Sequence, residues 1–511
     1  MNSDKDPDAV TAKLRQRLPI FASMRKSMIA SAVVLTGCTS TSVYLPPASE
    51  VTHDAWKDGQ WQSASPADNR PRGEWWKVYG DLNLDALESK IETANPTLAS
   101  ALARYEQANA YVKQLRSGLY PTIDAGDAVT QNRQSENRPL RSANQPNVYA
   151  AQTIGAAATY ELDLWGKVRN QIASGEAAAQ AESADVATIK LSLQAELALN
   201  YFRLRGIDEQ AKLLNDTVDA YSHALALTRN RHAGGIASGL DVSRAETQFS
   251  TVRVELSEGA SQRALYEHAI ATLIGEPAMN FSLSASHSGV AIPLIPLGLP
   301  STLLQRRPDI AAAERRIAAA NAGVGVARAA YFPDLSLNAG YGFQNTGAAN
   351  LLSLPNSFWT LGPSVIFNIF DGGLRDAKLR QARAKLDEEG ATYRAVTLVA
   401  FQQVEDELSS LKYERESEFD ELHAVESATK TLELAINRYR EGAVNYLEVA
   451  TAQTAALATR RRALDLHDRQ LQTSVDLIRA LGGGWAREAV PGDKGQPANS
   501  PDKATVTARN D

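Results

Sequence analysis

The chain has 511 residues, with 53 Lys and Arg against 59 Asp and Glu, seven His and a single Cys. A mildly acidic chain without a block of basic residues gives no electrostatic basis for nucleic-acid binding, and one cysteine excludes an internal disulfide. The histidines include no close pair with metal-ligand spacing, and no nucleophile motif is present. We therefore expect neither an enzyme nor a protein with a cofactor, apart from a covalent lipid.

The N-terminal region has the pattern of a bacterial lipoprotein signal peptide. Met24–Lys26 supplies positive charge, the short apolar run Met28–Leu35 follows, and small residues lead to Cys38. This order predicts a signal peptide over residues 1–37, with a possible start at Met24, and Cys38 as the lipidated first residue of the mature chain. Thr39 follows the cysteine instead of Asp, which in Gram-negative lipoproteins generally implies sorting to the outer membrane.

The next part of the chain is expected to contain a tether and a first structural unit. Residues 38–70 lack a regular pattern and are interpreted as an N-terminal tether between the lipid and the folded chain. Residues 71–275 are expected to form a helix, a β-hairpin and a helical hairpin in turn, over about 96–119, 120–164 and 166–275.

The second strand of this β-hairpin is expected over about 149–164. Tyr160, Leu162 and Leu164 alternate there with Glu161 and Asp163. Alternation of this kind gives a strand one apolar and one polar face.

A long coiled-coil seam follows the hairpin. From Leu193 to Leu225, apolar residues recur at alternating steps of four and three, and only Asn200 interrupts them. The Gly-rich segment 234–239 ends this pattern, and a second seam begins after Leu240. Roughly sixty residues of helix at ~1.5 Å each would extend on the order of 90 Å, so we expect a long antiparallel helical hairpin.

The second half of the chain is expected to repeat the first. After an irregular linker, 276–300, a second unit is expected over 301–485. Its predicted elements are a helix, a β-hairpin and a helical hairpin over 309–330, about 332–370 and about 373–482. Asn230-Arg231 corresponds to Asn437-Arg438 at an offset of 207, and an internal repeat of this length is more informative than a single motif.

Two further patterns complete this half of the chain. The predicted helix over 309–330 carries one narrow apolar stripe in which Ile310, Ala313, Ile317, Ala320, Val324 and Ala327 recur at steps of three and four. Residues 486–511 are rich in Pro, Gly, Ala and charge and are expected to be a disordered tail.

The stretch from Leu303 to Leu337, LLQRRPDIAAAERRIAAANAGVGVARAAYFPDLSL, carries a family resemblance. It is similar to the signature of the TolC-like outer-membrane factors of tripartite efflux systems, in the lipoprotein branch that serves pumps of the resistance-nodulation-division type. The resemblance covers the chain from about Cys38 to Trp485.

The strand pattern and the resemblance together lead to an expected assembly. Four amphipathic strands cannot close a membrane barrel, because open edges are not tolerated in lipid, so oligomerisation must supply the rest. The resemblance implies a homotrimer in which a transmembrane barrel of twelve strands continues into a barrel of twelve helices. Glu161 and Asp163 would then face a water-filled lumen. The residues expected to face lipid are Tyr160, Leu162, Leu164, Leu335, Leu337, Val365 and Phe367.

The resemblance also implies a function. The trimer would be a passive exit channel for drugs, toxic solutes or metal ions in the Gram-negative outer membrane, with its helical barrel in the periplasm. It would work with a periplasmic adaptor and an inner-membrane transporter. Two alternatives stay open at this point: a lipid-anchored structural coiled-coil protein without a pore, and an export channel for polypeptides.

The candidate site residues lie at the two helical turns. The resemblance makes these turns the periplasmic tips and the adaptor contacts, at Gly235, Ile236, Ser238 and Leu240 and at Gly442, Val444, Asn445 and Leu447.

The same resemblance supplies candidates for a gate. In relatives, an Arg/Tyr pair late in the second long helix and an Asp soon after the turn hold the tip closed. Arg438 and Tyr439 match the pair, but Thr451 occupies the Asp position. We expect Glu448 or Asp241 to substitute for the missing carboxylate.

Overall fold

The computed structural model describes residues 73–137, 146–287, 289–293, 307–347 and 349–483. The predicted signal peptide, Cys38, the tether and the C-terminal tail lie outside these residues. The chain forms two compact units. Of the described residues, the first includes 96–137, 146–189, 308–347 and 349–400, and the second includes 73–95, 190–287, 289–293, 307 and 401–483.

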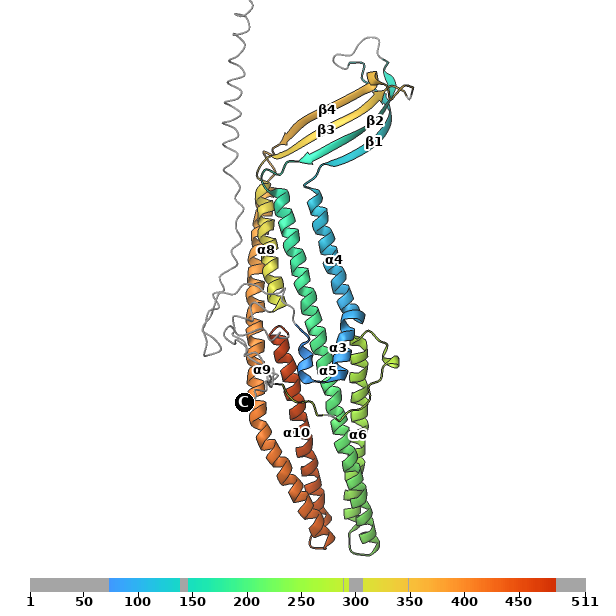
Figure 1. The fold of residues 1–511 in the computed structure, drawn as a ribbon, viewed down its shortest axis with the longest axis vertical. Helices are drawn as coiled ribbons and strands as arrows, with labels where there is room; N and C mark the ends of the chain where they lie inside the picture. The colour runs from blue at the N-terminus through green and yellow to red at the C-terminus, as the bar shows by residue number, and fades with distance from the viewer. Residues whose placement is uncertain (1–72, 138–145, 288, 294–306, 348, 484–511) are drawn as a thin grey trace, which may run out of the picture. The chain divides into compact units, whose positions relative to one another are not determined.

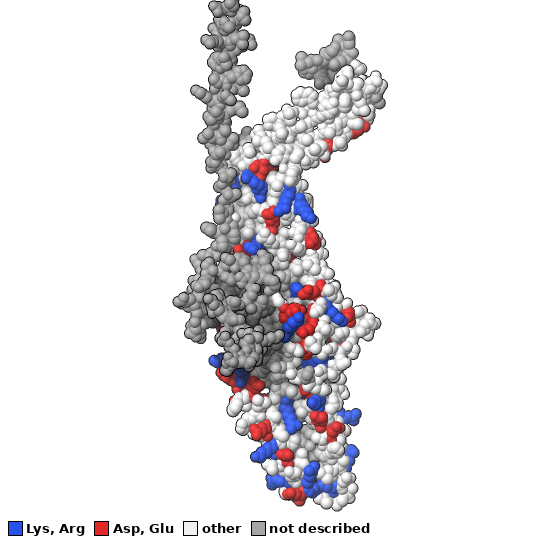
Figure 2. Space-filling view, viewed as in Figure 1, with Lys and Arg blue, Asp and Glu red and all other residues white. Residues whose placement is uncertain are grey.

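The first unit contains a four-stranded antiparallel sheet in the order β1–β2–β3–β4 (Figure 1). The two β-hairpins predicted from alternation are confirmed, and pairing between β2 and β3 joins them although they lie far apart in the chain. Figure 2 shows few charged side chains on the visible face of this sheet. The strands are Thr122–Arg133, Val148–Glu161, Asp334–Asn345 and Ser357–Ile366.

Two glycines allow β2 and β3 to approach closely at the middle of the sheet. Gly155 lies opposite Gly342 in the register of the two strands. A Cβ atom on Gly342 would lie 2.5 Å from the carbonyl oxygen of Ile154, and one on Gly155 would lie 2.8 Å from that of Tyr341. The backbone contact therefore leaves no room for a side chain at either position.

The prediction that the second strand extends to Leu164 is wrong, because Asp163 caps a helix. Its Oδ1 accepts a hydrogen bond from the Val168 N–H at 3.1 Å and its Oδ2 accepts one from the Arg169 N–H at 2.9 Å. A carboxylate satisfies free N–H groups at a helix N-terminus and is favoured there by the helix dipole. Leu162, Asp163 and Leu164 therefore lie beyond the strand, which ends at Glu161.

Of the two predicted polar positions, only Glu161 belongs to β2. Glu161 ends β2 and forms an ion pair with Lys167 at 3.0 Å. The fourth strand is also shorter than predicted, since β4 ends at Ile366 and Phe367 follows it. Both differences arise because apolar–polar alternation continues past the last ladder pair.

Short helices lead into both hairpins. Helices α4, Pro96–Ser117, and α8, Pro308–Ala329, each have 22 residues. The buried surface of α8 is wider than the predicted stripe. Ala311 and Ala312 lie outside that stripe, yet both are buried and pack with Ala184. Small side chains on more than one face let a helix approach two neighbours, so the buried surface is wider than a single seam.

Aromatic side chains fix the junction between helix and strand in the first unit. The Trp165 ring stacks on Phe332 with centroids 4.7 Å apart, and its Nε1–H donates to the Pro333 carbonyl at 2.8 Å. The start of α5 is thereby held against the end of α8.

Two helical hairpins account for most of the chain. Helices α5, Lys167–Ala233, and α9, Leu374–Arg440, each have 67 residues, and α6, Gly239–Leu273, and α10, Tyr446–Ala480, each have 35. The predicted seam from Leu193 to Leu225 is confirmed, since every position of it is buried or half-buried. None of the helices in the described ranges combines the length and apolarity needed to cross a membrane.

Aromatic residues and a short helix form the core of the second unit. The 3-10 turn η3, Trp75–Tyr79, precedes α3, Leu82–Ala94. The Tyr79 hydroxyl hydrogen-bonds the Ser474 hydroxyl at 2.7 Å, and the Tyr79 ring packs on Phe202. Asp81, which caps α3, accepts a hydrogen bond from the Tyr201 hydroxyl at 2.6 Å.

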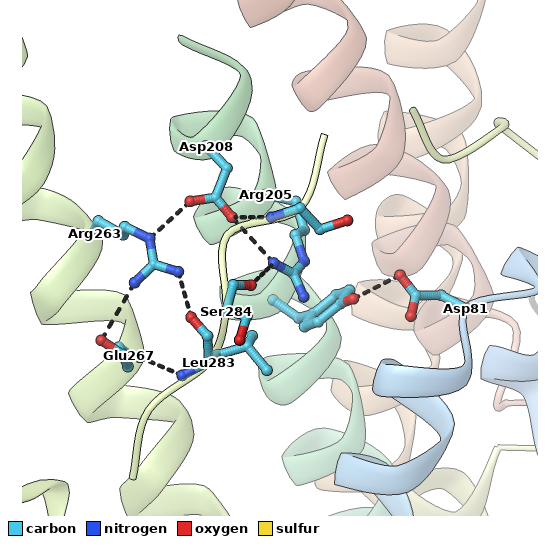
Figure 3. A network of polar contacts seen from close by, with 9 residues as sticks. Asp81, Arg205, Asp208, Arg263, Glu267, Leu283 and Ser284 are labelled. Carbon is cyan, nitrogen blue, oxygen red and sulfur yellow. Dashed lines mark hydrogen bonds and ion pairs between the residues drawn. The ribbon is translucent and has the colours of Figure 1, made fainter. Parts of the chain in front are cut away.

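A buried ionic network fastens the segment after α6 to the two helices of the first hairpin (Figure 3). Asp208 is 2 % exposed, and it accepts hydrogen bonds from Arg263 Nε at 2.7 Å and Arg205 Nη1 at 3.0 Å. The two guanidinium groups also donate to backbone carbonyls, Arg263 to Leu283 and Arg205 to Ser284. The carboxylate also accepts a hydrogen bond from the Ser286 N–H at 3.2 Å, so the segment after α6 is held as part of the network.

We expect Asp208→Asn to destabilise the second unit by about 3 kcal/mol, because it leaves the buried Arg205 without its carboxylate and leaves Arg263 with Glu267 as its only carboxylate partner in the described residues. Thermal unfolding followed by circular dichroism should show a lower Tm, and limited proteolysis should cut residues 281–287 faster. The matched control is Glu246→Gln, which removes an exposed ion pair with Arg229 and should cost less than ~1 kcal/mol. Equal shifts in the two variants would contradict a structural role for the network.

A close contact between α5 and α10 places a carboxylate against a glycine. A Cβ atom on Gly206 would lie 1.8 Å from Asp468 Oδ2, so the carboxyl occupies the space of the missing side chain. Burial raises the pKa of the Asp468 carboxyl to about 7, and the neighbouring carboxylates of Asp465 and Glu209 add to the shift. Between pH 3.8 and about 7, the Asp468 carboxyl is therefore protonated in the folded chain and ionised in the unfolded chain.

This raised pKa predicts a pH-dependent effect of Asp468→Asn. The stability that the protonated carboxyl contributes is present at low pH and is lost as the pH rises through about 7. The Tm of the variant relative to the wild type should therefore increase as the pH rises from about 4 to about 7 and stay constant above that. Asp420→Asn, on an exposed face of α9, is the control and should show no such trend. A constant difference between Asp468→Asn and the wild type would exclude the raised pKa.

Candidate functional site

The turn between α5 and α6 is closed by backbone hydrogen bonds and a capping box. Gly235 has φ +74°, and the Arg231 carbonyl accepts a hydrogen bond from the Ile236 N–H at 2.8 Å. Ser238 Oγ accepts from the Asp241 N–H at 3.1 Å, and Asp241 Oδ2 accepts from the Ser238 N–H at 3.2 Å. The Asp241 carboxylate is thus engaged in helix capping.

The turn between α9 and α10 has the same plan with a different cap. Gly442 has φ +77°, and the Arg438 carbonyl accepts from the Ala443 N–H at 2.9 Å. Asn445 Oδ1 accepts from the Leu447 N–H at 3.1 Å and so caps α10. Positive φ at the two glycines favours glycine over other residues, which explains why both turns keep one.

Apolar side chains are exposed at both turns. Ile236 is 71 % exposed, and Leu240 and Leu447 are also exposed. These residues were among the predicted tip residues. The turns therefore present apolar surface next to their capping groups.

Of the predicted Arg/Tyr pair, Arg438 is exposed and Tyr439 is buried. Arg438 forms an ion pair with Glu448 at 3.6 Å, and both side chains are more than half exposed. An exposed pair of this kind contributes about 0–1 kcal/mol. Thr451 donates its hydroxyl to the Leu447 carbonyl of its own helix at 2.8 Å.

Tyr439, by contrast, is buried between the two hairpins. Its hydroxyl hydrogen-bonds the Thr228 hydroxyl at 3.3 Å, and its ring meets Tyr446 edge-on at 5.6 Å. The surrounding core includes Leu225, Ala245 and Val449. Tyr439 thus joins the ends of α5 and α9 within one chain.

Arg231, which the sequence marks only as a repeat position, is a further functional candidate. Its guanidinium lies 4.8 Å from the centroid of the Tyr439 ring, and Nη1 donates to the Tyr439 carbonyl at 2.8 Å and to the Arg440 carbonyl at 3.4 Å. The last carbonyls of a helix lack partners within the helix and favour a cation. A signal was present, because Arg231 is the repeat counterpart of Arg438.

The groups at these turns do not form a metal site. Among the described residues, no cluster of three or more His, Cys, Asp or Glu side chains is arranged to hold a metal ion. Burial raises the pKa of the Tyr446 hydroxyl to about 12, so this hydroxyl stays neutral in the core of the turns. The geometry favours packing and ion pairing over catalysis.

Comparison with known proteins identifies the family to which this chain belongs. The family model described as outer membrane efflux protein matches residues 87–276 and 299–483. The chain belongs to the outer membrane efflux protein family. This efflux protein is the outer-membrane exit channel of a tripartite pump, as the sequence signature predicted, and members of its family are channels that work with an adaptor and an inner-membrane transporter.

Named relatives span nearly the whole of this efflux protein. The pyoverdine export outer membrane protein OpmQ of Pseudomonas aeruginosa is 31% identical over 468 residues, which are 90% of this chain and 96% of OpmQ. The outer membrane protein OprJ of the same species is 31% identical over 464 residues, 90% of this chain and 95% of OprJ. The cation efflux system protein CusC of Escherichia coli is 26% identical over 464 residues, 89% of this chain and 97% of CusC.

Solved structures agree with the fold. A membrane protein from Pseudomonas aeruginosa superposes with a TM-score of 0.80 at 29% identity, covering 88% of this chain and 98% of that one. The outer-membrane channel OprN has a TM-score of 0.78 at 28% identity, covering 86% and 98%. This efflux protein therefore shares both the strands and the helical hairpins of known outer-membrane channels.

We expect Arg231→Ala to loosen the turn between α9 and α10, because the carbonyls of Tyr439 and Arg440 lose their donor. Hydrogen–deuterium exchange should rise in residues 439–445 by about tenfold. Arg229→Ala is the matched control two residues away, since Arg229 pairs only with the exposed Glu246 in the described residues. Similar exchange in the two variants would show that Arg231 does not hold the turn.

Proposed function

We propose that three copies of this chain form a channel in which a twelve-stranded barrel continues into a twelve-helix barrel. The observation that supports it best is the open sheet. Strands β1 and β4 each have a neighbour on one side only among the described residues, and nearly every residue of β1 is exposed. In an antiparallel order, β4 of one copy runs in the right direction to pair with β1 of the next.

The helices support the same assembly. The two helical hairpins have equal lengths, as expected if an internal two-fold repeat gives quasi-equivalent helices around one axis. Exposed apolar side chains on α9, such as Leu398, Phe419 and Leu434, would be covered by a neighbouring copy.

We propose that Cys38 anchors the chain in the outer membrane. The lipoprotein signal predicts cleavage after residue 37 and a covalent lipid on the cysteine, with no other cofactor. The lipid and the barrel would hold the protein in the membrane while the helical barrel extends into the periplasm.

We propose small molecules or metal ions as the cargo. Relatives are named for the export of pyoverdine, antibiotics, toluene and cations, and none of the relatives named above is named for polypeptides. Membership of a channel family also removes the alternative of a structural rod without a pore.

We propose that the two turns form the periplasmic tip, where the adaptor binds and the channel closes. The exposed apolar residues Ile236, Leu240 and Leu447 would meet the adaptor, together with Gly235, Ser238, Gly442, Val444 and Asn445. The exposed Arg438–Glu448 pair is the gate candidate that can change partners most easily, since neither side chain is packed. Asp241 and Thr451 are weaker candidates because each is engaged within its own helix.

The purified protein should conduct ions in planar bilayers, and Arg438→Ala combined with Glu448→Ala should raise the single-channel conductance about twofold, because the narrow end loses an ion pair. The control exchanges the charges, Arg438→Glu with Glu448→Arg, and should return conductance towards the wild-type value. An absence of conductance in the wild type would contradict the proposed channel. Conductance unchanged in the Ala variant would remove only this pair from the gate.

A further inference from the structure

A groove on the second unit lies between α5, α9 and α10, away from the two turns. It encloses about 460 Å³, which falls within the range of small-molecule sites. Its walls come from three helices of one chain, so the groove is formed within the protomer.

The charges lining this groove are unbalanced towards the negative. Four carboxylates line it, Glu209 and Asp216 on α5 and Glu418 and Glu421 on α9, together with two cationic side chains, Lys212 on α5 and Arg460 on α10. Glu421 pairs with Arg462 at 3.3 Å. Within the described residues, Glu209 and Asp216 take part in no ion pair, and Lys212 lies between them on the same helix, so α5 contributes a net negative charge to one wall.

Helices α9 and α10 also line the groove with apolar side chains and with an unsatisfied acceptor. Leu422 and Leu464 line the groove, and Leu422 is exposed. Gln470 also lines the groove and is only 1 % exposed. Its Nε2 donates to Glu418 at 3.3 Å, but its Oε1 has no hydrogen-bond partner in the described part of the chain. A buried acceptor without a partner indicates a donor that is supplied by a ligand or by water.

We propose that this groove binds an amphipathic organic cation. The apolar part of the ligand would contact Leu422 and Leu464, its positive charge would lie near Glu209 and Asp216, and an N–H group would donate to Gln470 Oε1. A bare metal ion fits less well, because the described residues provide no cluster of metal-ligating side chains here. A purely apolar ligand would leave both the carboxylates and the Gln470 acceptor unpaired.

The proposal does not depend on the channel function, because binding can be measured without transport. The full-length protein in lipid nanodiscs would be titrated with ethidium, a planar aromatic cation that carries amino groups, and with fluorescein, an aromatic anion of comparable size. Fluorescence anisotropy, corrected with empty nanodiscs, reports binding of both probes. We expect saturable binding of ethidium and none of fluorescein.

Three variants locate the site. Glu209→Gln combined with Asp216→Asn should weaken ethidium binding about tenfold, and Leu422→Ser should weaken it as well. The control, Glu426→Gln combined with Glu433→Gln, removes two charges from an exposed part of α9 and should leave binding unchanged.

Equal binding of both probes, or equal effects of the groove and control variants, would overturn the site. A protein that conducts ions but does not bind ethidium would refute the groove alone. A protein that binds ethidium in the groove but does not conduct would refute the channel alone.

Discussion

The unpaired backbone at the two edges of the sheet is the constraint on which the proposed assembly depends. In the described chain, β1 and β4 each offer one row of N–H and C=O groups without a partner strand. In hydrocarbon each such group costs several kcal/mol, which far exceeds what side chains of a twelve-residue strand can offset. The sheet can therefore be stable in a membrane only when another copy supplies the missing edge. Because each strand connects to a helix through a short junction, closing the sheet also gathers the helices around one axis.

The connections between strands and helices in the first unit are fixed by packing and by helix capping, so the sheet determines where the helices begin. Asp163 ties the end of β2 to the first turn of α5, and Trp165 stacks on Phe332 at the start of the next hairpin. The close Gly155–Gly342 approach brings β2 and β3 together at their middle. The position of the first turn of α5 thus follows from the strand register.

Long-range periodicity was readable from the sequence, whereas local side-chain partners were not. The seam from Leu193 to Leu225 and the two β-hairpins depend on many residues in register, so single exceptions such as Asn200 did not obscure them. Asp163 was misplaced because one carboxylate fits a polar strand face and a helix cap equally well in sequence. Ala311 and Ala312 were left off the stripe because steps of three and four select one side of the helix, whereas small alanine side chains allow close packing on other sides as well. The repeat pairs Arg231 with Arg438, but the partners of Arg231 are backbone carbonyls, which the sequence does not record.

The division of Arg438 and Tyr439 between solvent and core has a consequence for how the proposed tip would open. Tyr439 is held by Thr228, Tyr446 and Arg231, and burial of its ring alone is worth about 2 kcal/mol or more. The exposed Arg438–Glu448 pair contributes at most about 1 kcal/mol. Separating the two hairpins of one chain is therefore costlier than breaking the surface pair. Opening would then proceed by movement of whole protomers against each other, with each pair of turns moving as one body and only the exposed charges exchanging partners.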